Sequence, residues 1–216
     1  MNRYLYRIFI FFCFLLFSSV VFSQELKSKY PFDQWTVAEL DAANTAKNVD
    51  YLTVNERNVI FYLNLARING KLFAQTYAQK YIDSTKWKKN IYVTSLITTL
   101  KNQSYLKPLI PSKEVSDIAK KYAILMGKEG FTGHRDTDKR FSALKTGYKS
   151  RGENCDYGNK NSLAIVMNLL IDDGISSYGH RKNILDKEYN YIGVSIQPHK
   201  TYKYTCVMDF IYLEKK

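Results

Sequence analysis

A chain of 216 residues can bury a sizeable core in one domain, and 45% hydrophobic with 24% charged residues is a globular composition. This balance excludes a disordered or fibrous chain. The formal net charge of +12 comes from scattered lysines, and no dense basic tract with interleaved aromatic residues is present, so we expect no nucleic-acid partner.

The first 23 residues have the three parts of a secretory signal peptide. Arg3 and Arg7 give a positive start, residues 8–17 are an apolar run, and smaller residues follow as far as Ser23. The apolar run is too short for a comfortable membrane span, and no second run follows it. We therefore expect cleavage after residue 23 and a secreted, periplasmic or cell-surface protein with no stable membrane span. An uncleaved N-terminal anchor is the alternative.

The cysteines of the remaining chain suggest a disulfide. Cys13 leaves with the signal peptide, so Cys155 and Cys206 remain. Two cysteines in an exported protein favour a bond, and closing a loop of about 50 residues would contribute about 4 kcal/mol. We predict a Cys155–Cys206 disulfide that ties the segment around Glu153 to the last strand. Two buried free thiols are the alternative.

The first half of the mature chain is predicted to be helical. Residues 24–50 are interpreted as an N-terminal extension with a short helix. Thr53 and Glu56 have the spacing of a capping box, and apolar residues then recur at helical intervals. A second amphipathic run covers residues 71–83, and a short helix is expected at residues 95–100.

A second helical stretch leads to the first histidine. Two prolines break the chain before Ser112, which is a good N-cap for a helix over residues 113–126. Glycines should end that helix near residues 127–130, which places His134 just beyond its C-terminus. A short extended segment is expected around Glu153.

The last part of the chain combines one helix with a hairpin. Ser162 is predicted to cap a helix that ends at Gly174, with His180 in the loop that follows. Residues 191–197 and 202–213 are typical of a β-hairpin. No linker rich in proline, glycine or serine divides the mature chain, so residues 51–216 are interpreted as one domain.

Two of the three histidines, His134 and His180, lie in Gly-His-Arg triplets whose flanks are unrelated, and Glu153 lies between them. Two neutral imidazoles and a carboxylate can hold a zinc-like ion with an open position, or act in acid/base catalysis near neutral pH. The alternative is that each histidine is structural and that Glu153 caps a turn or pairs with an arginine. The His-Glu-x-x-His spacing of zinc proteases is absent.

Several short motifs follow one another along the chain. They are Asn-Leu-Ala-Arg at 64–67, Pro-Leu at 108–109, Phe-Thr-Gly-His at 131–134 with Arg140 after it, Gly-Glu-Asn at 152–154, Gly-His-Arg-Lys-Asn-Ile-Leu at 179–185 and Ile-Gly-Val at 192–194. In this order they resemble the CAP superfamily of cysteine-rich secretory, antigen 5 and pathogenesis-related 1 proteins, also called the SCP domain. The resemblance covers residues 52–213 and is to the bacterial branch. It implies an α+β fold, an α-β-α sandwich with a large central groove.

The resemblance also implies a groove tetrad of two histidines and two acids. His134 and His180 match its histidines, and Glu153 matches its first acid. Family members bind divalent metal through the two histidines, which implies zinc or a similar ion at His134 and His180. The second acid should lie in the helix before His180, which offers only Asp172 and Asp173. Asp173 falls near the expected place, so the candidate catalytic set is His134, Glu153, His180 and Asp173, with a helix-end acidic pair as the alternative interpretation.

We therefore expect a secreted, monomeric binding module whose groove holds a divalent metal ion and an unknown ligand, which would be a lipid, a peptide or an envelope component. A metal-dependent or general-base hydrolase of peptides or envelope polymers is the alternative function. A lipid carrier with a vestigial site is the third. The fold alone does not select a reaction.

Overall fold

The computed structural model describes residues 33–214, so the predicted signal peptide lies outside the described residues. The chain divides into two compact units, Met1–Leu40 and Asp41–Lys216. Helix α2 (Val37–Ala43) spans the division, and the later elements all belong to the second unit. Between residues 33 and 214, no helix is long and apolar enough to cross a membrane.

The second unit is built on a sheet whose described strands have the order β1-β3-β4-β2. β3 (Tyr191–His199) and β4 (Lys203–Tyr212) form the antiparallel hairpin that the sequence predicts. β2 (Ser150–Tyr157) pairs antiparallel with β4 at one edge, and β1 (Ile110–Pro111) pairs parallel with β3 at the other. The sequence did not predict β1, because two residues are too few to show a period.

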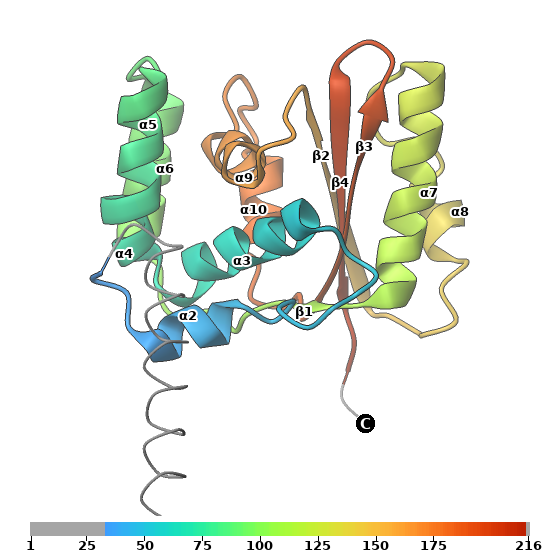
Figure 1. Cartoon of the computed structure of the whole chain (residues 1–216), viewed down its shortest axis with the longest axis horizontal. Helices are drawn as coiled ribbons and strands as arrows, with labels where there is room; N and C mark the ends of the chain where they lie inside the picture. The colour runs from blue at the N-terminus through green and yellow to red at the C-terminus, as the bar shows by residue number, and fades with distance from the viewer. Residues whose placement is uncertain (1–32, 215–216) are drawn as a thin grey trace, which may run out of the picture. The chain divides into compact units, whose positions relative to one another are not determined.

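Helices cover both faces of this sheet and complete the α-β-α sandwich that the resemblance implied (Figure 1). α7 (Lys113–Glu129) and the short α8 (Thr137–Phe141) lie on one side. α3 (Val54–Ile68), α9 (Ser162–Ile171) and α10 (Gly179–Ile184) lie on the other. Because β2 is the edge strand, segments from both helical layers can reach its side chains.

After α3 the two helical runs that the sequence predicts form the arms of a helical hairpin. α4 (Gly70–Phe73), a π-helical turn (Ala74–Ala78) and α5 (Gln79–Thr85) make the first arm. α6 (Ile91–Asn102) makes the second arm and begins earlier than predicted, because the Asn90 side chain accepts a hydrogen bond from the third helical N–H.

Local hydrogen bonds explain where two other helices begin. The Thr53 N–H donates to Glu56 at 2.7 Å, and the Thr53 hydroxyl accepts from the Glu56 N–H, which confirms the predicted capping box. The prediction that Ser162 caps α9 is wrong, because Asn161 accepts the capping bond and the Ser162 hydroxyl donates to the Asn55 carbonyl.

The end of α9 also differs from the sequence prediction. The helix ends at Ile171 and not at Gly174, because Asp172 adopts a left-handed conformation with φ 58°. His180 lies in the first turn of α10 rather than in a loop. The early reversal at Asp172 allows this residue to meet the start of α10.

The predicted disulfide is wrong, because Cys155 and Cys206 are both buried free thiols. In the β2–β4 register, Cys155 lies opposite Val207, whereas Cys206 lies opposite Asp156. Successive side chains of a strand point to opposite faces, so the two thiols lie on opposite faces of the sheet. A bond would need a one-residue shift of register, which would move every side chain of the strand to the opposite face of the sheet.

Candidate functional site

Tyr122 fixes the loop that carries His134. This tyrosine lies on α7, and its hydroxyl donates to the Gly133 carbonyl at 2.8 Å and accepts from the Arg135 N–H at 2.6 Å. Because both neighbours of His134 are bonded to one buried side chain, the imidazole projects from a fixed backbone. Burial is the largest influence on the Tyr122 hydroxyl and raises its pKa, so it remains a neutral donor.

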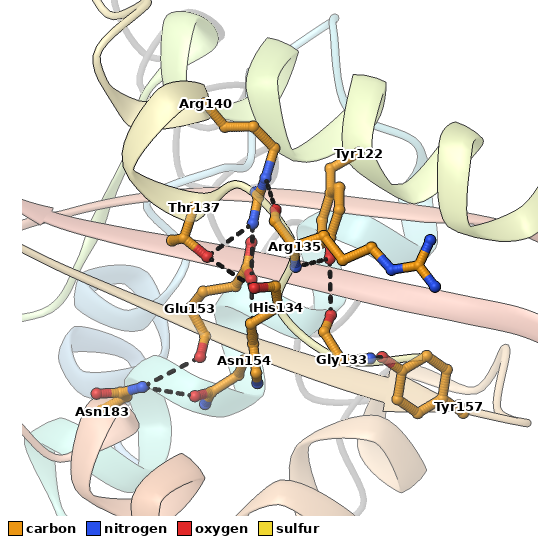
Figure 2. Close-up of polar contacts among 10 residues, drawn as sticks. All are labelled: Tyr122, Gly133, His134, Arg135, Thr137, Arg140, Glu153, Asn154, Tyr157 and Asn183. Atoms are coloured by element: carbon orange, nitrogen blue, oxygen red, sulfur yellow. Dashed lines mark hydrogen bonds and ion pairs between the residues drawn. The ribbon is translucent and has the colours of Figure 1, made fainter. Parts of the chain in front are cut away.

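His134 and Glu153 form a tight pair on the α7 side of β2, as Figure 2 shows. The His134 Nδ1 atom lies 2.7 Å from Glu153 Oε1. Arg140 donates from Nη1 to Oε2 at 2.5 Å and from Nη2 to Oε1 at 2.9 Å. Since an ionised carboxylate only accepts hydrogen bonds, Nδ1 carries a proton, and in the neutral imidazole Nε2 then has a free lone pair.

The charge on Glu153 is stabilised by these partners. Burial alone would raise the pKa of Glu153, but the hydrogen bonds from His134 and Arg140 outweigh it and hold this pKa below its ordinary value. The carboxylate is therefore ionised at neutral pH. Only 3% of its side chain is exposed, whereas 46% of the His134 side chain is exposed. The pair thus combines a partly exposed imidazole with a buried carboxylate.

A second acid lies directly beside this pair. Asp209 is opposite Glu153 in the β2–β4 register, is fully buried, and neither of its carboxyl oxygens meets a hydrogen-bond donor among residues 33–214. Burial first, and then the Glu153 charge, raise the pKa of Asp209 well above its ordinary value. A neutral Asp209 can donate its own proton to Glu153, which would give a partner to one of its two unpaired oxygens.

The second histidine has its own carboxylate. His180 Nδ1 lies 2.7 Å from Asp172 Oδ1, and the other oxygen accepts the backbone N–H of His180 at 3.0 Å. The same oxygen accepts the Arg181 N–H at 3.3 Å. Asp173, which the sequence placed in the candidate set, accepts instead from Asn90 at 3.1 Å. The structure thus brings His180 together with Asp172.

The edge strand β2 connects the two histidine–carboxylate pairs. Glu153 and Asn154 are neighbours, so their side chains point to opposite faces. The Asn154 side chain donates to the His180 carbonyl at 2.9 Å. Asn183 donates to Asn154 at 2.8 Å and to the Glu153 carbonyl at 3.3 Å (Figure 2). These hydrogen bonds link both histidine–carboxylate pairs to residues 153 and 154 of β2.

Asp156 is an acid of this region that the sequence analysis did not identify. It lies two residues after Asn154 on the same face of β2, is buried, and accepts from Asn159 and Asn168. Burial raises the pKa of Asp156 to about 6, although the two amides and the nearby His180 lower it. The alternation of side chains along β2 could have revealed Asp156, because it places residues 154 and 156 on the same face of the strand.

One group of donor atoms in the described residues is compact enough to hold a metal ion. Donor atoms of His134, Glu153 and Cys155 lie within 4.8 Å of one another. Burial raises the pKa of the Cys155 thiol well above its ordinary value, so this sulfur is protonated and a poor ligand at neutral pH. The sequence predicted His134 and His180 as metal ligands instead. Both imidazoles have Nδ1 bound to a carboxylate, which is the usual arrangement of metal-binding histidines.

A model of the cysteine-rich secretory protein (CAP) family matches residues 63–210. The chain matches no curated protein sequence.

Several solved structures match as well. An extracellular protein with an SCP domain from Bacillus anthracis is 22% identical, with a TM-score of 0.43 over 57% of this chain and 39% of its own. Venom allergen-like protein 4 of Schistosoma mansoni is 14% identical, with a TM-score of 0.46 over 76% of this chain and 92% of its own. An outer surface protein of Borrelia burgdorferi is 17% identical, with a TM-score of 0.42 over 50% of this chain and 80% of its own. The chain thus spans well under half of the Bacillus protein.

Proposed function

Because the chain belongs to the cysteine-rich secretory protein (CAP) family, we propose that it is a secreted binding module that holds a divalent metal ion through His134 and His180. Residues 1–23 are the signal peptide in this proposal, residues 24–50 an extension, and residues 51–216 the CAP domain. The single observation that carries the metal assignment is the matching state of the two imidazoles, each of which has Nδ1 bound to a buried carboxylate at 2.7 Å.

This arrangement supports metal binding for a chemical reason. A carboxylate on Nδ1 fixes the ring, selects the tautomer and makes Nε2 a better donor. Glu153 orients the His134 ring and Asp172 orients the His180 ring. Carboxylates from different parts of the chain therefore hold the two imidazoles in the same way. A structural histidine needs no free ring nitrogen. The third histidine, His199, illustrates this, because both of its ring nitrogens lie within hydrogen-bond distance of backbone atoms.

Exposure also favours a site that opens to solvent. The His134 and His180 side chains are 46% and 24% exposed, while their carboxylate partners are 3% and 1% exposed. Two protein nitrogens leave further coordination positions of a zinc ion for water or a ligand. When bound, the ion would supply a Lewis acid that can hold a carboxylate or carbonyl oxygen of a ligand. The protein's own contribution is to orient both imidazoles.

Titration of the purified protein with zinc by calorimetry tests this proposal. We expect one ion per chain, and we expect the affinity to fall at least about a hundredfold in both His134→Ala and His180→Ala, because each change removes one ligand. His199→Gln is the matched control and should bind zinc like the wild type. Absence of zinc binding in wild type, or equal binding by the double alanine variant, would contradict the proposal.

A further inference from the structure

The helical hairpin of α5 and α6 carries a groove that is separate from both histidines. A cavity of about 640 Å³ lies between these two helices and the loop that joins them, where Figure 1 shows α5 and α6 side by side. We call it the α5–α6 groove. Its volume is within the range of ligand-binding clefts, roughly 300–1,000 Å³. Its lining includes Ile82, Lys86, Trp87, Lys89, Val93 and Ile97.

The floor of the groove is apolar. Ile82 from α5 and Val93 from α6 are buried beneath it, and Ile97 continues the surface one turn further along α6. Trp87 lies in the connecting loop, with its ring 6.3 Å from that of Tyr81. A half-buried tryptophan beside aliphatic side chains is typical of the anchor points of protein interfaces.

The rim of the groove is positively charged at the loop end. Lys86 and Lys89 both line it, and the one acid of its lining, Asp83, already accepts from Gln79 at 2.8 Å. Three lysines of the described residues, Lys47, Lys113 and Lys149, have carboxylate partners. Neither Lys86 nor Lys89 forms such an ion pair within residues 33–214, so both can contact a partner's carboxylate. The rim therefore favours a negatively charged partner.

The groove continues onto the outer face of α6. A second hollow of about 580 Å³ shares Lys89, Thr94 and Thr98 with the first. It also contains Ile91, whose side chain is 71% exposed. The two hollows together form an open, elongated surface with apolar points and a basic end. Such a shape suits an extended chain better than a compact small molecule.

We propose that the α5–α6 groove binds an acidic peptide segment of a partner protein, with its apolar side chains on Trp87 and Ile97 and its carboxylates at Lys86 and Lys89. This site goes beyond the metal proposal and does not depend on it, because none of the groove residues contacts His134. His134→Ala should therefore leave peptide binding unchanged, so failure of one proposal is distinguishable from failure of the other.

Fluorescence anisotropy with a short labelled peptide of alternating glutamate and leucine tests this site on the purified protein. We expect saturable binding that weakens about tenfold in the double variant Lys86→Glu/Lys89→Glu and about tenfold when lysine replaces glutamate in the peptide. Trp87→Ala should weaken binding by a similar factor, about tenfold. The matched control Lys120→Glu/Lys121→Glu makes the same charge change on exposed lysines of α7 and should have no effect.

Three results would overturn the proposal. They are absence of binding, equal binding of the acidic and basic peptides, and an equal loss in the α7 control. A separate experiment measures binding of the protein to phosphatidylglycerol vesicles. If the wild type binds these vesicles but not the peptide, and Lys86→Glu/Lys89→Glu abolishes vesicle binding, the surface binds a membrane and the peptide proposal is wrong.

Discussion

Replacement of Arg67 by methionine is expected to lower the free energy of unfolding by about 4 kcal/mol or more. Arg67 is fully buried on α3, and its guanidinium donates to four backbone carbonyls. The Nε atom donates to Lys107 at 3.0 Å, Nη1 to Ile184 and Asp186 at 2.7 and 2.8 Å, and Nη2 to Tyr189 at 3.2 Å.

The size of this effect follows from the carbonyls that would lose their donor. A buried acceptor left without a partner costs about 1–3 kcal/mol, and hydrogen bonds to charged groups are stronger than neutral ones. Burial lowers the pKa of Arg67 to about 10, so the group is still charged at neutral pH. Arg67 thus joins α3 to the segment between α10 and β3, which leads from the second histidine into the sheet.

Urea denaturation followed by circular dichroism measures this effect. Arg57→Met is the matched control, because Arg57 lies on the same helix, is only partly buried and donates to a single carbonyl, that of Val49, at 2.8 Å. The control should lose no more than about 1.5 kcal/mol. Equal losses in the two variants would contradict the role assigned to Arg67.

Asp172→Asn is expected to weaken zinc binding about 10- to 100-fold, the usual cost of losing a carboxylate behind a metal-binding histidine. Both oxygens of Asp172 accept N–H groups, from the His180 ring on one side and from the His180 and Arg181 backbone on the other. An amide can accept on one side only, and its NH₂ group would face a donor on the other. The imidazole would lose its orientation and part of its basicity.

The neighbouring acid provides the control for that experiment. Asp173 is in the next position, but its carboxylate accepts only from Asn90 among the hydrogen bonds described here, so Asp173→Asn should keep the zinc affinity of the wild type. Calorimetric titration of both variants, with circular dichroism to verify folding, gives the answer. Equal affinities in the two variants, or a greater loss in Asp173→Asn, would show that the assignment of Asp172 to His180 is wrong.

The sequence was informative wherever a local pattern determines the structure. The capping box at Thr53, the helix after Ser112 and the hairpin that forms β3 and β4 each follow from residues a few positions apart. The family motifs also predicted that His134, Glu153 and His180 belong to one groove. Each of these predictions rests on spacing that can be read along the chain.

The remaining features depend on register and on backbone reversals that spacing does not reveal. The disulfide prediction failed because the β2–β4 register places the two cysteines on opposite faces. Asp172 meets His180 because it adopts a left-handed conformation, which is unusual for a residue other than glycine. Asp209 lies beside Glu153 because of strand pairing across more than fifty positions. None of these could be predicted from local sequence.

A crystal structure of the protein grown with zinc, with anomalous diffraction recorded at the zinc edge, tests the central claim most directly. We expect one anomalous peak about 2 Å from the Nε2 atoms of both His134 and His180, with Glu153 and Asp172 still bound to the Nδ1 atoms. A peak at Cys155 and Glu153 instead, or no peak near either histidine, would contradict the claim that these two imidazoles form one metal site.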